Sequence, residues 1–447
     1  MDRPIARVFD LVAPESQRIE NMSLEQALEV LRGERPAELL GVRGSFALVA
    51  RVDERVLLAR SLDRPLRYFL AKEPSGPMLI VAERIDHVRD QLDALGYGGQ
   101  FHPSYTRMVP AHHVTTLRLI GCPDPNPQHR RFFDPPRAVL PPDLDQIGAR
   151  YVDALLREAR HWLEAQDEAT RRLPIGVCFS GGIDSGAVLI ALYRTLLDLG
   201  QSPSRLKAFT LRVGSGGGDA DQAREFLRRL DLEVLGEQIE APVEAMDPLR
   251  AVEVIEDYKP LDVECAAVAL ALLEGIRDRY PEWRLLADGD GGDENLKDYP
   301  LEENEELTIR SVVSNRMLYQ EGWGVEAIKH SLTYSGGLSR ACVRTWAPAR
   351  GLGFVSWSPF TRPALVEVAE AIPFDVLTRG STSALYSLKG EVVRRGFRQL
   401  LDLDFPVFEK RRFQHGAASA ELVASRFGSP VEAAMRYRRH FELAYAR

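Results

Sequence analysis

Two serines, two glycines and an aspartate stand together at residues 180–185, in the order Ser-Gly-Gly-Ile-Asp-Ser. The apolar run 175–179 precedes them and the apolar run 187–192 follows, which predicts a strand, a tight turn and a helix. Backbone N–H groups in such a turn, with a helix N-terminus behind them, form an anion site. The hydroxyls of Ser180 and Ser185 can donate further hydrogen bonds, and the glycines let the backbone approach a polyanion closely.

Asp184, inside this turn, needs a separate explanation. A carboxylate beside bound phosphates repels them unless a cation lies between the two. The simplest interpretation is a nucleotide pyrophosphate loop in which Asp184 binds Mg²⁺. The segment is not a GxxxxGK[ST] pattern, which favours holding pyrophosphate over γ-phosphoryl transfer. An ordinary Ser/Gly turn between a strand and a helix is the alternative.

A second acidic segment, residues 288–295, directly follows the predicted strand 283–287. It interleaves four acids with three glycines in the order Asp-Gly-Asp-Gly-Gly-Asp-Glu-Asn. A second aspartate facing Asp184 would complete a Mg²⁺ site made of two carboxylates and phosphate oxygens. The spacing does not fit an EF-hand, because Tyr299 rather than glutamate would end a twelve-residue loop begun at Asp288. A flexible surface loop is the alternative.

Length and composition limit the classes of protein that this chain can represent. With 447 residues, 45% of them hydrophobic and 27% charged, it is expected to fold as two globular domains. A net charge of −8 argues against a broadly basic, nucleic-acid-binding surface. The sequence shows neither an apolar signal region nor a run of about 18 apolar residues. We therefore expect a cytoplasmic protein that does not enter a membrane.

The order of apolar runs and turn residues divides the chain into three parts. Residues 1–121 alternate short apolar runs with turn signals and predict a β-rich domain. Seven prolines crowd residues 122–142, which predicts a linker, because proline disrupts helices and central strands. From residue 143 to 447, strands expected at 175–179, 206–213 and 283–287 alternate with helices, which indicates an α/β fold with a doubly wound parallel sheet. Ligands of such sheets bind at the carboxyl ends of the strands, where both acidic loops begin.

The two loops together resemble those of the asparagine synthetase-like amide ligases, a branch of the pyrophosphate-loop ATP pyrophosphatases. In that family an SGGxDS loop binds the pyrophosphate of ATP, and a later GxGxDE-type loop supplies the other Mg²⁺ ligand. The resemblance implies a doubly wound ATP pyrophosphatase domain, with Asp184 and Asp293 as the metal carboxylates. It also implies that ATP contacts one set of residues in the two loops: Ser180, Gly181, Gly182, Asp184, Ser185, Gly289 and Gly291.

Two further residues take catalytic roles by resemblance. Residues 409–416, Glu-Lys-Arg-Arg-Phe-Gln-His-Gly, look like the family's late lysine segment, which implies that Lys410 stabilises charge as the acyl-adenylate forms or breaks down. Without the family, this basic cluster could equally clamp phosphate or form a solvated face. Asp290 stands where asparagine synthetases have a catalytic glutamate and β-lactam synthetases have a tyrosine. Asp290 is thus a candidate base for the amine, with a solvated loop acid as the alternative.

The N-terminal part carries a fainter resemblance, to a class II glutaminase domain. It rests on residues 44–47, 58–60 and 65–68. That domain needs a cysteine at position 2, where this chain has Asp2, and no cysteine precedes Cys122. We therefore expect a degenerate domain without glutamine hydrolysis, which serves as a scaffold. The glutamate that β-lactam synthetases pair with their tyrosine is also missing, because the sequence has no acid from residue 344 to 366.

Together these features predict an ATP- and Mg²⁺-dependent ligase that forms an amide through an acyl-adenylate. Its expected partners are a small-molecule or peptide carboxylate and ammonia or an amine, which attacks between molecules or within one molecule to close a lactam. No nucleic acid is expected as a partner, and a homo-oligomer is compatible with the sequence. Two alternatives stay open: another pyrophosphate-loop adenylating enzyme, and a non-catalytic nucleotide-binding or partner-binding protein.

Overall fold

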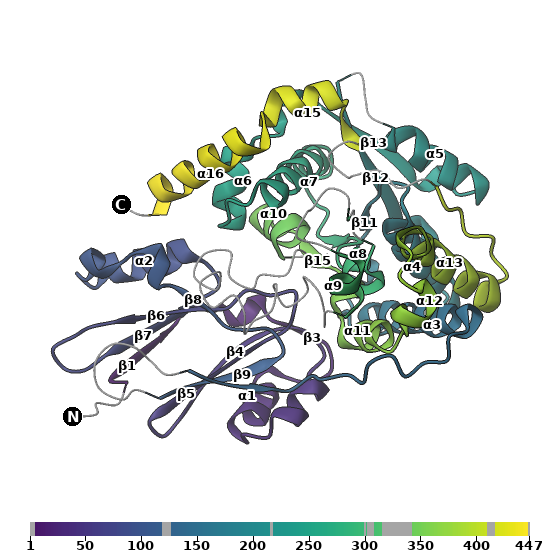
Figure 1. The fold of residues 1–447 in the computed structure, drawn as a ribbon. Coiled ribbons are helices and arrows are strands. Elements are labelled where there is room, and N and C mark those ends of the chain that lie inside the picture. The colour runs from purple at the N-terminus through teal and green to yellow at the C-terminus, as the bar shows by residue number, and fades with distance from the viewer. Residues whose placement is uncertain are drawn as a thin grey trace.

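The computed structural model describes residues 5–118, 127–214, 218–298, 301, 308–314, 342–408 and 416–445. Within these ranges the N-terminal part contains two four-stranded sheets, ordered β1-β7-β6-β8 and β10-β9-β5-β4 (Figure 1). Their strands are β1 Arg7–Asp10, β4 Ala47–Val52, β5 Arg55–Arg60, β6 Arg67–Ala71, β7 Met78–Ala82, β8 Arg107–Met108, β9 His113–Arg118 and β10 Gln128–Arg131. Two short strands, β2 Arg18–Ile19 and β3 Gly44–Ser45, pair with each other, and two helices, α1 Leu24–Arg32 and α2 Ile85–Ala94, accompany the sheets.

The strand β10 lies inside the Pro-rich segment that the sequence predicts as a linker. It pairs antiparallel with β9 at the edge of its sheet. An edge is the place where a Pro-rich segment can join a sheet, because one side of the strand needs no hydrogen-bond donors. Part of the segment 122–142 therefore belongs to the N-terminal sheet, whereas the limits of the two domains stay a prediction.

The C-terminal part is built on a parallel sheet. Among the described residues it has five strands in the order β13-β12-β11-β14-β15, and every neighbouring pair is parallel. The strands are β11 Ile175–Cys178, β12 Leu206–Val213, β13 Gly236–Ala241, β14 Leu285–Ala287 and β15 Val355–Trp357. The predicted α/β fold with a doubly wound parallel sheet, preceded by a β-rich region, is confirmed.

Helices cover both faces of this sheet (Figure 1). Their bounds are α3 Leu144–Glu164, α4 Ile183–Asp198, α5 Asp219–Arg229, α6 Pro248–Ile255, α7 Pro260–Arg279, α8 Gly292–Leu296, α9 Ile309–Ser314, α10 Ala347–Gly351, α11 Pro363–Glu370, α12 Phe374–Thr378, α13 Thr382–Leu401, α15 Ala420–Phe427 and α16 Pro430–Tyr445. Alternate residues of β12 serve the two faces: Leu206 and Ala208 pack in the core with α3, α4 and α13, whereas Phe209 and Leu211 pack in the core with α6 and α7. This alternation follows from the two-residue period of a strand.

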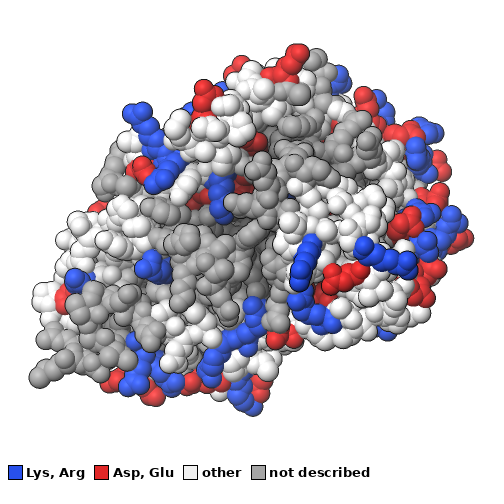
Figure 2. Space-filling view, in the orientation of Figure 1, with Lys and Arg blue, Asp and Glu red and all other residues white. Residues whose placement is uncertain are grey.

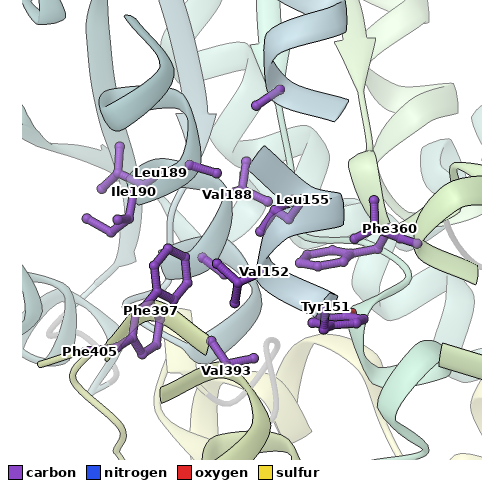
Figure 3. Packing of buried hydrophobic residues seen from close by; sticks show 14 of the residues in the cluster. Tyr151, Val152, Leu155, Val188, Leu189, Ile190, Phe360, Val393, Phe397 and Phe405 are labelled. Atoms are coloured by element: carbon purple, nitrogen blue, oxygen red, sulfur yellow. The ribbon is translucent and has the colours of Figure 1, made fainter. Parts of the chain in front are cut away.

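The helices α3 and α13 cross at a point where their backbones touch. Gly148 of α3 faces Gly396 of α13, and a Cβ added to either glycine would collide with the backbone of the other helix. Around the crossing, Val152, Val393 and Phe397 fill the core (Figure 3). Because this contact leaves no room for adjustment, it fixes the position of α13 relative to the sheet.

The N-terminal sheets are joined to the C-terminal part by buried ion pairs. Arg67 of β6 donates to Glu256, just after α6, at 3.0 and 3.1 Å, and both side chains are almost fully buried. Arg350 of α10 pairs with the buried Glu83 at 2.6 Å. The core that contains α6, α7 and α16 also includes residues of β6, β7 and α2, so one apolar core crosses between the two parts.

The described surface carries charges of both signs. On the face drawn in Figure 2, Lys and Arg alternate with Asp and Glu instead of gathering into one patch. Several are helix pairs four residues apart, such as Arg438 with Glu442. In the described part of the chain no helix combines the length and apolar character that crossing a bilayer requires.

Candidate active site

Residues 179–182 connect β11 to α4, and Ile183, Asp184 and Ser185 form the first turn of α4, in the predicted order of strand, turn and helix. Gly181 has a φ of +74°, and a Cβ there would lie 2.6 Å from the backbone nitrogen of Ala223 in α5. Glycine is therefore needed for both the backbone conformation and the close approach. The Ser180 hydroxyl accepts a hydrogen bond from Gly182 N at 3.2 Å and lies 3.3 Å from the Ser185 hydroxyl, so the loop is internally braced.

The second loop, which follows β14, packs directly against the first. A Cβ on Gly289 would lie 2.8 Å from Ser185 N, and a Cβ on Gly292 would collide with the Asp184 carboxylate. Gly291 has a φ of +99°, which turns the chain into the short helix α8. The glycines of the second segment thus allow its acids to approach Asp184.

A lysine that sequence reasoning missed lies between the two loops. The Lys389 ammonium, from α13, donates to Asp184 and to Asp293, the latter at 2.5 Å, and lies 3.5 Å from Asp298. Lys389 is only 3% exposed. Burial alone would lower its pKa, but Asp184, Asp293 and Asp298 together raise the pKa well above its ordinary value. Lys389 therefore stays protonated and joins the three carboxylates.

These groups line one cavity at the carboxyl ends of β11 and β14. Its described lining residues come from both loops, from α5, α7 and α13, from the end of β11, from the helical turn Cys342–Trp346 and from the segments after α8 and α13: Cys178, Ser180, Gly182, Ile183, Asp184, Ser185, Asp219, Gln222, Cys265, Asp288, Gly289, Asp290, Gly291, Asp293, Glu294, Asp298, Arg344, Thr345, Lys389 and Phe408. This is the edge of a doubly wound sheet where ligands bind.

Asp290, in the same cavity, lies near the Arg344 guanidinium. Burial raises the pKa of Asp290 to about 6, although Arg344 and a hydrogen bond from Thr345 oppose the rise. Neighbouring Asp288 is 1% exposed; it accepts hydrogen bonds from Ser358 Oγ at 2.9 Å and from the backbone nitrogen of Asp290 at 3.0 Å. Burial, and next the charge of Asp290, raise the pKa of Asp288 well above its ordinary value. These contacts fix the direction of the loop that carries Asp290.

The structure brings most of the predicted site residues together. Ser180, Gly182, Asp184, Ser185, Gly289, Asp290, Gly291 and Asp293 all line the cavity. Gly181 packs behind the loop against α5 and does not belong to the described lining. Lys410 lies outside the described residues, so its role stays a prediction.

Sequence reasoning overlooked Lys389 and Arg344. A signal for Lys389 exists: it occupies an inward position of an amphipathic helix, four residues after Leu385 and four before Val393, both buried. A lysine at such a position is rarely buried unless it has acidic partners. No comparable signal identifies Arg344, because its place beside Asp290 depends on the path of the chain before α10.

Residues 164–336 match the family model of asparagine synthase. The match takes in both acidic loops, so this part of the chain is similar to the asparagine synthase family, which bears out the resemblance seen in the loops. Members of the family are ATP-dependent ligases, which supports an ATP-dependent, amide-forming enzyme. The N-terminal sheets, Arg344 and Lys389 lie beyond the matched residues. A comparison with curated proteins gives no match.

Proposed function

We propose that this protein joins a carboxylate to ammonia or an amine through an acyl-adenylate, with release of pyrophosphate and AMP. One observation carries the proposal. Asp184 and Asp293, from two loops more than a hundred residues apart, converge on a single cation, the Lys389 ammonium, at the floor of a cavity lined by the Ser/Gly loop.

The charges at this end of the cavity fit a magnesium ion. Three carboxylates, those of Asp184, Asp293 and Asp298, lie within 4 Å of one ammonium, that of Lys389. No three His, Cys, Asp or Glu side chains of the described residues form a complete metal site by themselves. Mg²⁺ commonly takes one or two carboxylates and completes its shell with phosphate oxygens and water, so Asp184 and Asp293 suit it when ATP is present. When bound there, Mg²⁺ would neutralise charge on the phosphates.

The first half-reaction uses this end of the cavity. A carboxylate oxygen of the substrate attacks the α-phosphorus of ATP, the bond between the α-phosphorus and the bridging oxygen breaks, and pyrophosphate leaves. Backbone N–H groups of the loop 180–185 and the Ser180 and Ser185 hydroxyls hold the departing anion in this half-reaction, a role that their position in the cavity lining at the N-terminus of α4 supports. Lys389 supplies a permanent positive charge beside it.

The second half-reaction places Asp290 beside the acyl carbon. The amine attacks that carbon, AMP leaves, and the proton lost from nitrogen passes to the Asp290 carboxylate. A pKa of about 6 makes Asp290 a better proton acceptor than an ordinary aspartate, while it stays ionised at neutral pH. The resemblance adds Lys410 as a second positive charge. No cysteine precedes Cys122, so we propose that the N-terminal sheets act as a scaffold and that the amine comes from solution.

ATP–pyrophosphate exchange across a panel of carboxylic acids tests the proposal. We expect exchange that depends on one acid and on Mg²⁺, that is lost in Asp184→Ala and that is kept in Asp278→Ala, which alters an exposed aspartate. Exchange with no acid, together with undetectable ATP binding, would contradict the ligase and favour a partner-binding protein. ATP binding without exchange would favour the non-catalytic nucleotide-binding alternative.

A further inference from the structure

The cavity has a second group of acidic residues, besides the carboxylates that contact Lys389. Asp290 and Glu294 line it, and Asp262 of α7 lies beside it, 3.9 Å from the Arg344 guanidinium. Besides Lys389, Arg344 is the only positive side chain in the described lining. Three carboxylates therefore lie near one guanidinium.

Glu294 gives the strongest indication that this group binds a ligand. It is 5% exposed, and its Oε1 atom receives no hydrogen bond from any described residue. Asp290 Oδ2, in the same group, likewise accepts no hydrogen bond within the described part of the chain. Buried carboxylate oxygens without donors are costly, and they are common where a ligand supplies the donor.

The chemistry of these groups selects a cationic ligand over an anionic one. An anion would meet Arg344, but Glu294, Asp262 and Asp290 lie close enough to Arg344 to act on its charge, and they repel an anion. A metal ion is disfavoured in this group, because the guanidinium lies among the carboxylates. An ammonium group offers three N–H donors on a flexible chain and suits two unsatisfied carboxylate oxygens.

We propose that the amine substrate is an aliphatic amine with a second, positively charged amino group. The reacting amine meets Asp290, and the second ammonium donates to Glu294. This proposal rests on the proposed function, since it names the nucleophile of the same site. Three residues separate Glu294 from Asp290 in the sequence, and the cavity wall between them belongs to one turn and α8.

Calorimetric titration with 1,4-diaminobutane and with n-butylamine tests this assignment. Both amines are titrated into the full chain, with and without Mg²⁺ and α,β-methylene-ATP, from which pyrophosphate cannot leave. We expect 1,4-diaminobutane to bind at least about tenfold more tightly than n-butylamine, a difference of about 1.4 kcal/mol. Glu294→Gln should reduce this preference to within about twofold. Glu294→Asp, which keeps the charge, should restore part of it.

The matched control is Glu168→Gln, whose side chain is 91% exposed and should leave the preference unchanged. Equal affinity for the two amines, no binding of either amine, or a preference that survives in Glu294→Gln would overturn the proposal. The titrations with α,β-methylene-ATP distinguish failure of the proposed function from failure of the amine assignment. If the analogue does not bind, the proposed function is contradicted. The preference between the two amines is measured in the titrations without the analogue and does not depend on its binding. Thermal melting of each variant shows that it is folded.

Discussion

Lys389 Nζ lies 2.5 Å from Asp293 Oδ1, although 96 positions separate the two residues in the sequence. The contact joins the inner face of α13 to the loop after β14, and Asp184 from the first loop shares the same ammonium. The position of α13, fixed where Gly396 touches Gly148, therefore decides where the positive charge of the site lies.

Replacement of Lys389 by Met should destabilise the protein in the absence of divalent cations. The change removes the ammonium that Asp184, Asp293 and Asp298 share, and loss of one partner from a buried ion pair costs about 3–5 kcal/mol. Mg²⁺ should restore part of this loss, because a cation then bridges the carboxylates. Urea unfolding with EDTA and with MgCl₂ measures both effects, and Lys72→Met, at an exposed position, is the control. If the free energy of unfolding of Lys389→Met is the same with EDTA and with MgCl₂, the metal site is contradicted.

Replacement of Asp290 by Asn should separate the two half-reactions. ATP–pyrophosphate exchange should persist, because Asp290 does not contact the Lys389 cluster, whereas amide formation should slow by about 10²–10⁴-fold through loss of the general base. Asp290→Glu should retain much of the amide-forming rate. Equal loss of exchange and amide formation in Asp290→Asn would assign the residue to binding instead.

The amide-forming step should depend on pH through Asp290. Its pKa in the folded protein is raised to about 6 by burial, and only the deprotonated carboxylate can accept the proton of the amine. The rate should therefore rise with pH through about 6, level off above it, and fall about tenfold per unit below it. Single-turnover amide formation between pH 4.5 and 8 measures the pH profile. If the rate of Asp290→Asn still rises through about pH 6, Asp290 is not the group that accepts the proton.

Replacement of Gly181 by Ala should weaken both the fold and the anion site. The positive φ disfavours alanine, and its Cβ would meet the backbone of α5, which together should cost about 1–3 kcal/mol. Gly41→Ala, where a Cβ meets nothing within 4 Å, is the matched control. Urea unfolding and ATP affinity give the two readouts, and wild-type values for both in Gly181→Ala would show that the loop tolerates a side chain.

Replacement of Glu256 by Gln should loosen the contact between the two parts of the chain. The change leaves the Arg67 guanidinium buried without its counter-ion, at a cost of about 3–5 kcal/mol. Glu253→Gln, at the exposed side of α6, should have a much smaller effect. Hydrogen exchange at Ile85 N, which donates to Glu256 at 2.5 Å, reports on this contact locally. Unchanged exchange and stability would show that the apolar core alone holds the parts together.

The sequence alone determined the local chemistry and the fold class. Glycine and serine between an apolar strand and an apolar helix predict the loop 180–185, because turn conformation and hydrophobic period are properties of neighbouring residues. The same reasoning found the second loop and the parallel sheet. It did not find β13, β15 or α8, whose short runs carry little periodicity.

The tertiary structure alone decided which charges meet. Lys389 and Arg344 come from segments distant from the loops. The residues next to them in the sequence do not predict that Lys389 contacts Asp293 or that Arg344 lies near Asp290. Their places depend on helix crossings such as Gly148 with Gly396, that is, on contacts between residues far apart in the chain. Local sequence specifies local conformation, but the balance of charge in a buried cavity is set by the packing of the whole domain.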